Sequence, residues 1–505
     1  MTSYSDLIAR IGKAIADLTG YSAGLGNLLG SMTLSTATQE YQDEIAKRID
    51  YYKGEAQTHF ETYVDAHYPK KALRESMKQN YRAYNITEIV IDGVSVVYAE
   101  APERKLVKPD GSPVDDKETA LYEWLVKDIQ LDCWMQTVNS YVSLCDTVLV
   151  RPFWYKGKLR LEMITPDMFT PIEDPQCRTE ALAMVYHVDY VDNLGQNIQI
   201  SYVWTEEAVA VIQATGAQQV NEYSDNPYGI LPFARFVHEM PTLEYLAPHG
   251  SELIDQQEAL NIELAQLAYL VRMQSFSVPV LIGYEPNKNE QIAVSPGDPV
   301  VIGPSSNDMN PGSFHFETPS PEIEGSLNKI RTTINMILYK YGLQNTQFSE
   351  QTGGEASGIA LRIKNERLLE RRKKELPFYI AGEQDLFEII KKVWNTHAHE
   401  ATNEYANVLF SDDTRLDIQI PEPETITDPV DDRENWQWLF DNSLSTPVDY
   451  LAQTHKISVE DAQAIYDANQ KWRDENGTNE IPVETATGNF DEKTMTEEPT
   501  NEEPA

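Results

Sequence analysis

Two long stretches with a helical spacing of apolar residues dominate the middle of the chain. In residues 251–275, apolar positions recur three, four or seven apart and form one stripe: Leu253, Leu260, Leu264, Leu267 and Val271. Residues 320–342 carry a similar stripe: Ile323, Leu327, Ile330, Ile334 and Ile337. Pro321 suits the first turn of the second helix, and Gly342 suits the position just after its end. The pattern predicts two amphipathic helices.

The segments next to these helices follow different patterns. Residues 276–319 contain prolines, glycines and short β-like runs, so we expect a small β-rich insertion between the two helices. A polar loop over 343–356 follows, and then a long helix opens near Ser357. Pro377 lies inside that helix and predicts a kink. Two interpretations remain open from the pattern alone: a helical hairpin within a larger core, or a stalk carrying a small domain at its far end.

Residues 36–250 mix helical and strand patterns and predict an α+β region. Helical spacing covers 38–80, 117–128 and 131–144. Alternating runs predict strand pairs at 147–163, with a turn at Lys156-Gly157, and at 183–204. Residues 85–97 are apolar and β-branched, and their periodicity does not distinguish a helix from a strand.

The two ends of the chain differ from its middle. Residues 1–35 combine a weak amphipathic pattern with a Gly/Ser/Thr-rich stretch, which indicates a peripheral arm. Residues 357–423 continue the long helix and end in a short strand. Residues 424–475 predict a small helical domain, whose last helix begins with a capping box at Ser458–Asp461. Residues 476–505 hold eight acids and one lysine, which predicts a disordered acidic tail.

Composition narrows the class of protein. The chain of 505 residues has a formal net charge of −39, and such a surface repels nucleic-acid phosphate and argues against a sequence-reading DNA-binding protein. The sequence has no apolar run of about eighteen residues and no signal-peptide pattern, so neither a membrane span nor secretion is expected. Cys133, Cys145 and Cys177 fit no zinc spacing or disulfide framework, and we expect them to be small core residues.

Motifs that would indicate an enzyme are incomplete. The glycine-rich segment 353–358 lacks the lysine of a phosphate-binding P-loop. Ser357 is followed directly by Gly358, which does not fit a nucleophile elbow. His397 and His399 lie two apart, on different helix faces, and support no metal site. We therefore expect no catalytic residues, no metal and no cofactor.

A dense run of basic residues is the strongest positive feature of the sequence. Its members are Arg362, Lys364, Arg367, Arg371, Arg372, Lys373 and Lys374. Such a run either contacts nucleic-acid phosphate or forms ion pairs between subunits. We favour ion pairs between subunits, because identical copies of so acidic a chain repel each other unless cations lie at their interfaces.

Several sequence segments, in this order and spacing, resemble the portal proteins of tailed bacteriophages, particularly the SPP1-like type. They are Leu161-Glu162-Met163-Ile164-Thr165-Pro166-Asp167-Met168-Phe169, then Asn226-Pro227-Tyr228-Gly229-Ile230-Leu231-Pro232-Phe233, then Gly250-Ser251-Glu252-Leu253 with Gln257-Glu258-Ala259-Leu260-Asn261, and lastly Gly354-Glu355-Ala356-Ser357-Gly358-Ile359-Ala360-Leu361. The resemblance covers about 40–475 and favours the stalk over the plain hairpin.

The resemblance implies an α+β portal fold in ring-forming subunits. It implies an N-terminal arm at 1–35, a wing at 36–250, stem helices at 251–275 and 320–342, and a clip at 276–319. It further implies a tunnel loop at 343–356, a kinked tunnel and wing helix with a strand at 357–423, a helical crown at 424–475 and the acidic tail at 476–505.

The same resemblance implies roles for two sets of residues. Stem packing, within the chain and between adjacent subunits, is expected for Leu260, Leu264, Leu267, Ile330, Ile334 and Ile337. The DNA channel is expected to be lined by Gln344, Asn345, Thr346, Gln347, Phe348, Ser349 and Gln351. Phe348 is the apolar exception in this loop, and it either contacts DNA or anchors the loop on a neighbour.

In function, the resemblance implies a ring, generally dodecameric, at one capsid vertex. Double-stranded genomic DNA passes through it during packaging and ejection. The implied partners are the terminase large subunit, the head–tail adaptor, and the major capsid and scaffold proteins, without a membrane. The protein is expected in the virion after synthesis in the bacterial host cytoplasm. The alternatives are another head–tail connector ring protein and an enzyme of DNA metabolism.

Overall fold

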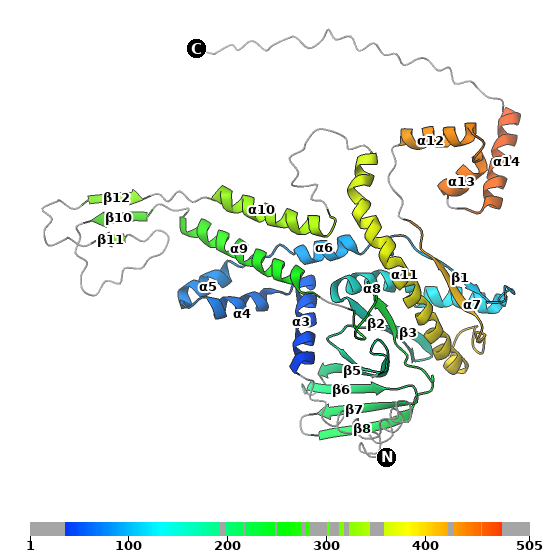
Figure 1. Ribbon diagram of the computed structural model, residues 1–505, viewed down its shortest axis with the longest axis horizontal. Helices are drawn as coiled ribbons and strands as arrows, with labels where there is room; N and C mark the ends of the chain where they lie inside the picture. The colour runs from blue at the N-terminus through cyan, green and yellow to red at the C-terminus, as the bar shows by residue number, and fades with distance from the viewer. Residues whose placement is uncertain are drawn as a thin grey trace, which may run out of the picture. The chain divides into compact units, whose positions relative to one another are not determined.

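The computed structural model divides the chain into two compact units. The larger takes Met1–Glu355 and Ala360–Glu424, and the smaller takes Ala356–Ile359 and Thr425–Ala505. The structure describes residues 36–174, 176–191, 195, 197–215, 218–247, 250–274, 278–282, 300–302, 313–317, 323–343, 358–422, 429–455 and 457–476. The predicted N-terminal arm and acidic tail lie outside this set, except for Asn476. Helices and strands mix throughout the larger unit, so the α+β class is confirmed (Figure 1).

Among the described residues, six helices precede most of the sheet structure of the larger unit. They are α3 (Thr36–Lys53), α4 (Gln57–His67), α5 (Lys71–Gln79), α6 (Ile86–Val94), α7 (Asp116–Asp128) and α8 (Leu131–Cys145). The helical pattern over 38–80 is thus divided into three helices, with a break at Gly54, whose φ of +77° favours glycine. The ambiguous stretch 85–97 is mainly helical, and Asn85 caps α6 by accepting a hydrogen bond from the Glu88 amide.

Two antiparallel sheets follow these helices. The first has the order β3-β2-β9, from β2 (Thr147–Tyr155), β3 (Lys158–Ile164) and β9 (Ala234–Val237). Its predicted hairpin is confirmed, because Lys156 and Gly157 have φ of +50° and +78°, as a two-residue turn requires. The second is a five-stranded meander: β4 (Phe169–Glu173), β5 (Ala181–Val191), β6 (Asn197–Trp204), β7 (Ala208–Thr215) and β8 (Gln218–Asp225).

A long helix, α11 (Gly358–His397), provides one wall of the main core. It runs for 40 residues, continues through Pro377, and is followed by the 3-10 turn η1 (Ala398–Glu400). Its buried side chains, including Tyr379 and Trp394, pack against α7, α8 and the first sheet. Beside it, β13 (Arg415–Gln419) pairs antiparallel with β1 (Glu103–Val107). The short strand predicted near 416–420 is therefore confirmed.

The smaller unit has three described helices: α12 (Pro429–Asp441), α13 (Pro447–His455) and α14 (Val459–Asn476). Trp436 packs against Tyr450 edge-to-face, with ring centroids 5.1 Å apart. Ser458 caps α14, as one half of the predicted capping box, because its Oγ accepts from the Asp461 amide at 3.1 Å and donates to the Asp461 carboxylate at 2.8 Å.

Candidate functional site

The two central helices form an antiparallel pair, α9 (Glu252–Gln274) and α10 (Ile323–Lys340). Ion pairs fix their direction, since Lys340 contacts Glu252 while Lys329 Nζ lies 2.8 Å from Glu263 Oε1. Residues late in α10 therefore meet residues early in α9. Figure 1 shows the pair extending beside the smaller helices α4 and α5.

The predicted stem-packing residues come together in one apolar cluster at this pair. Its buried members include Leu260, Ile330, Ile334 and Ile337, and Leu264 and Leu267 pack against them. The cluster also contains Ile45 of α3 and Val90 of α6, so the helix pair packs against other helices of the larger unit. Two residues of the predicted stripes are exposed rather than buried: Leu327 on α10 and Val271 on α9.

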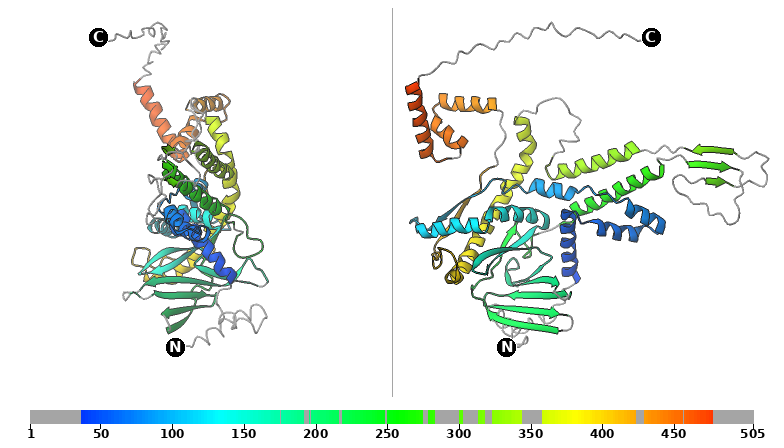
Figure 2. Two further views of the ribbon diagram at one scale, coloured as in Figure 1. Left: turned by 90° about the vertical axis from the view of Figure 1, so that its left-hand side faces the viewer. Right: turned by 180° about the vertical axis from the view of Figure 1, so that it is seen from behind.

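A second apolar face on α9 was not predicted from the sequence. Ile262, Ala265 and Tyr269 pack with the α4–α5 hairpin, around the buried Phe60 and Met77. At 3.6 residues per turn, these positions lie roughly opposite Leu260 and Leu264. Figures 1 and 2 show α9 between α10 on one side and α4–α5 on the other. The helical spacing of 262, 265 and 269 was the available signal in the sequence, but the leucine stripe on the other face is longer and more evident.

Gln257 joins α9 to the start of α6 through buried hydrogen bonds. Its side-chain oxygen accepts from the backbone amides of Ile86 at 2.7 Å and Thr87 at 3.1 Å. Its amide nitrogen donates to the Tyr84 carbonyl at 2.9 Å and to Asn261 Oδ1 at 2.8 Å. The first turn of a helix leaves its N–H groups without helical partners, and here a side chain from another helix satisfies two of them.

The insertion between α9 and α10 contains a small sheet. Its strands are β10 (Val278–Ile282), β11 (Val300–Ile302) and β12 (Ser313–Glu317), with β10 in the centre. The β-rich character expected for 276–319 is therefore confirmed. Phe314 and Phe316 project from the outer strand β12, are 57% and 60% exposed, and have ring centroids 5.1 Å apart.

The chain leaves α10 through a fixed turn. Gly342, at φ +78°, donates to the Tyr339 carbonyl at 3.1 Å, and the Leu343 amide donates to the Leu338 carbonyl at 2.9 Å. These two bonds form a Schellman motif, as Gly342 predicts. Leu343 then lies over Gly93, where an added Cβ would approach its Cδ1 to 2.7 Å. The channel-lining residues predicted at 344–351 lie outside the described residues.

The predicted basic run, which begins with Arg362 and Lys364, lies on the first half of α11. Arg367 donates to the Tyr339 hydroxyl at 3.1 Å and lies over its ring. Arg371 Nε contacts Glu375 Oε1 at 2.7 Å, and Lys373 Nζ lies 3.2 Å from Glu422 Oε1. Much of this charge is therefore engaged within one chain. Lys374 is exposed and has no ion pair within the described part of the chain.

Arg372 differs from its prediction as an inter-subunit residue. Its residue exposure is 1%, and its guanidinium donates to the carbonyls of Val96, Val97 and Pro421. Burial lowers the pKa of this guanidinium. A side chain enclosed by its own subunit does not reach another subunit, so the prediction was wrong for Arg372. The carbonyls that surround position 372 belong to distant segments, so its burial was not visible in a run of charged residues.

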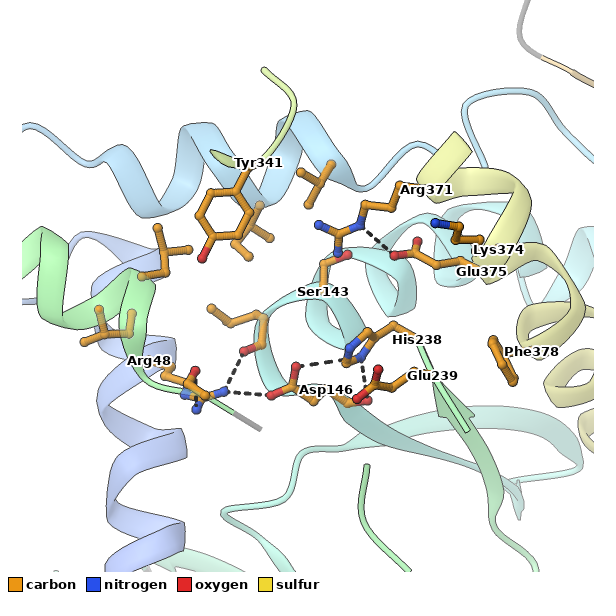
Figure 3. Close-up of a pocket in the computed structure, with 16 residues that line it drawn as sticks. Arg48, Ser143, Asp146, His238, Glu239, Tyr341, Arg371, Lys374, Glu375 and Phe378 are labelled. Atoms are coloured by element: carbon orange, nitrogen blue, oxygen red, sulfur yellow. Dashed lines mark hydrogen bonds and ion pairs between the residues drawn. The ribbon is translucent and has the colours of Figure 1, made fainter. Parts of the chain in front are cut away.

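A pocket of about 450 Å³ is lined by residues of α3, α6, α8, α9 and α11 and by residues that directly follow α8, β9 and α10 (Figure 3). Arg48, which is 3% exposed, donates to Asp146 Oδ2 at 2.9 Å and to the Gly250 carbonyl at 2.8 Å. Burial opposes its charge, but Glu44 and Asp146 outweigh that effect and raise the pKa of Arg48. His238 also lies against Asp146, with Nδ1 3.7 Å from Oδ1. These ion pairs and hydrogen bonds connect the segments that line the pocket to one another.

The described residues offer little catalytic chemistry. None of their His, Cys, Asp and Glu side chains gather in groups of three that could hold a metal ion. His397 instead stacks on Trp154 and contacts Glu400 at 3.1 Å. Cys145 is buried as expected, but Cys133 and Cys177 are exposed, so their prediction as core residues was wrong. No helix in the described ranges is long and apolar enough to span a bilayer.

A comparison with models of protein families shows which family the chain belongs to. The family model described as phage portal protein, SPP1 Gp6-like, matches residues 34–420, which include α9, the small sheet, α10 and most of the larger unit. A comparison with curated proteins found no match. Portal proteins are structural components of the virion rather than enzymes. The match covers most of the 505 residues, and the chain therefore belongs to the SPP1 Gp6-like family of phage portal proteins.

Proposed function

We propose that copies of this chain assemble into a ring, dodecameric as is typical of portals, around a channel for double-stranded DNA. The genome enters the capsid through this channel during packaging and leaves through it during ejection. The observation that carries the proposal is the family match over residues 34–420, which spans the helix pair, the small sheet and α11. A cyclic ring uses two different surfaces of each subunit, one for each neighbour.

The parts of the subunit take the following roles in this proposal. Residues 36–250 form the wing, α9 and α10 form the stem, and the insertion 276–319 forms the clip. The tunnel loop is 343–356, the tunnel and wing helix with its strand is 357–423, and the crown is 424–475. The antiparallel direction of α9 and α10 supports the stem and clip, because it returns the chain to its starting level after the small sheet.

The stem has apolar side chains for contact with adjacent subunits. Leu260, Ile334 and Ile337 are buried within one chain. Leu327 and Met336 are 39% and 67% exposed on α10, and they pack against neighbouring copies in the proposed ring.

The charge of the chain suits a channel that DNA must slide through. The net charge of −39 limits attraction to phosphate, and every contact between phosphate and a cation adds affinity that movement must break. The tunnel loop is polar and uncharged at six of its channel-lining positions: Gln344, Asn345, Thr346, Gln347, Ser349 and Gln351. These side chains hydrogen-bond to water or DNA without forming ion pairs. Phe348 either contacts DNA or anchors the loop on a neighbour.

The clip is the docking site for the terminase large subunit during packaging and for the head–tail adaptor afterwards. Phe314 and Phe316 support this assignment, because they offer an exposed aromatic pair on an outer strand. Aromatic side chains are enriched among the residues that dominate binding energy at protein interfaces. The major capsid and scaffold proteins are the further proposed partners of the ring.

Single-particle imaging of the purified full-length chain, with a mass measurement in solution, tests the proposal. We expect rings with a central hole and a mass many times that of one chain. A monomer or dimer at every protein concentration and ionic strength, or a compact particle without a hole, would overturn it.

A further inference from the structure

A second group of basic residues lies outside the predicted basic run, around α5. Residues 68–82 contain five cations, and Glu75 is their only acid. The cations are Lys70, Lys71, Arg74, Lys78 and Arg82. In a chain of net charge −39, such a concentration of positive charge is a distinct surface feature. We call it the α5 basic patch.

Part of this patch remains without neutralising charge in the isolated chain. Arg74 and Lys78 share Asp65 of α4, at 3.5 and 2.8 Å. Lys70 and Lys71 are exposed and have no ion pair within the part of the chain that the structure describes. Their positions before and at the start of α5 hold them away from the apolar side chains that pack on α9.

Carboxylates with matching helical spacing lie on α6. Glu88 and Asp92 are four residues apart and exposed, and the apolar Ile89 beside them is 41% exposed. Side chains four apart on a helix have Cβ atoms about 5–6 Å apart, so Glu88 and Asp92 repeat the spacing of Arg74 and Lys78. The opposite face of α6 is buried, with Val90 and Val94 in the apolar cluster of the stem.

The basic and acidic surfaces lie on opposite sides of α9. The α4–α5 hairpin packs on Ile262 and Ala265, whereas α6 packs with Leu253 and Leu260 on the other face. A head-to-tail ring joins two different surfaces on opposite sides of each subunit. Complementary charge on two such surfaces brings identical, strongly acidic chains together in one orientation.

We propose that the α5 basic patch of one subunit binds the Glu88–Asp92 face of α6 on a second copy of this chain. This contact rests on the proposed ring and identifies one of its interfaces. It also accounts for the apolar Ile89, which is covered between the two charged rows. Screening by salt acts on such exposed charges, so the contact weakens as ionic strength rises.

Charge reversal on each side, and on both sides together, tests this contact. Lys70→Gln with Lys71→Glu reverses the basic side, and Glu88→Lys with Asp92→Asn reverses the acidic side. Asparagine at 92 keeps an oxygen acceptor for the Tyr52 hydroxyl, which donates to Asp92 at 2.8 Å. Lys105→Glu is the matched control, because Lys105 is exposed and belongs to β1, away from both surfaces. Circular dichroism checks that each variant is folded.

The fraction of chains in rings, measured by mass photometry across protein concentrations, is the readout. Each one-sided variant is expected to need about ten-fold more protein for half-assembly, and the combined variant is expected to recover most of that loss. The Lys105→Glu control is expected to assemble like the natural chain. One-sided variants that assemble normally, or a combined variant no better than either, would overturn the inference.

Two further outcomes separate this inference from its alternatives. If the natural chain forms no rings at all, the proposed function fails. If, in addition, the natural chain and both variants all have the mass of one monomer, the contact between copies is overturned as well. If the basic variant assembles normally but loses affinity for a fluorescent DNA duplex, the α5 basic patch binds nucleic acid, and the contact between copies is wrong.

Discussion

Replacing Gln257 by leucine removes the side chain that caps α6 from α9. Gln257 is 1% exposed, and its oxygen accepts from the Ile86 and Thr87 amides. Leucine fills a similar volume, so the substitution mainly removes hydrogen bonds. It leaves the buried Thr87 N–H without its partner, whereas the Ile86 N–H keeps a second acceptor, the Tyr84 carbonyl at 2.8 Å.

A buried N–H left without a partner costs about 1–3 kcal/mol, which is the cost expected for Thr87. The lower figure corresponds to roughly a five-fold change in a local opening equilibrium, since about 1.4 kcal/mol is a factor of ten. Gln257→Glu keeps an oxygen acceptor and places a negative charge at the positive end of α6. We therefore expect Gln257→Glu to lose less than Gln257→Leu.

Hydrogen exchange of the amides at Ile86 and Thr87 measures this effect locally, without requiring the whole chain to unfold in one step. Gln257→Leu is expected to speed exchange by roughly five-fold or more at the Thr87 amide, and by less at the Ile86 amide, which keeps its bond to the Tyr84 carbonyl. Gln266→Leu is the matched control, since Gln266 is an exposed glutamine of the same helix whose bond goes to the Tyr68 hydroxyl. Exchange in Gln257→Leu at the rate of the natural chain would refute the capping role.

Three other perturbations have defined outcomes. Changing Gln344, Asn345 and Gln347 together to lysine is expected to leave rings intact and lower the yield of packaged DNA, measured in an in vitro packaging assay, because new cations bind phosphate at the constriction. Arg372→Met is expected to lower the free energy of unfolding by about 1–3 kcal/mol in a denaturant titration, because three backbone carbonyls lose their donor. Gly382→Ala is expected to cost about 1–3 kcal/mol in the same titration, because its Cβ would approach a phenylalanine ring of β9 to 2.8 Å.

Matched variants control for each of these three changes. Serine at the same three loop positions keeps them polar and uncharged, and an equal packaging defect in the serine variant would contradict the electrostatic argument. Lys373→Met removes an exposed ion pair worth little to stability, so a loss as large as that of Arg372→Met would contradict the role of burial. Gly250→Ala meets no atom within 4 Å, and an equal cost there would contradict the close approach at Gly382.

The sequence correctly predicted those helices and turns whose local pattern of apolar and turn residues matches the way they pack in the structure. The stripe at Leu260 and Leu264 marked α9, and the turn at Lys156-Gly157 marked the β2–β3 hairpin. Helix or strand was undecided for 85–97, because Asn85 is the local cap of α6 and the second cap, Gln257, lies far along the chain. Tertiary contact of this kind leaves no mark in a local apolar pattern.

Burial of single residues was harder to predict than the elements themselves. Arg372 lies among charged neighbours in sequence, yet three carbonyls from distant segments surround its guanidinium. Cys133 and Cys177 are exposed although cysteine is commonly buried. The tunnel-loop residues and the inter-subunit role of the stem remain predictions.

The two apolar faces of α9 have a consequence for how the protein tolerates mutation. Side chains on both sides of this helix are fixed by neighbours, at Leu260 on one face and Ala265 on the other. α10 is buried along one face only and exposes Met336 and Tyr339. Polar substitutions are therefore expected to be rejected at the apolar positions of both faces of α9, whereas α10 rejects them on its one buried face and at Leu327 and Met336, which the proposed ring covers, so the two helices are expected to diverge at different rates as phage lineages separate.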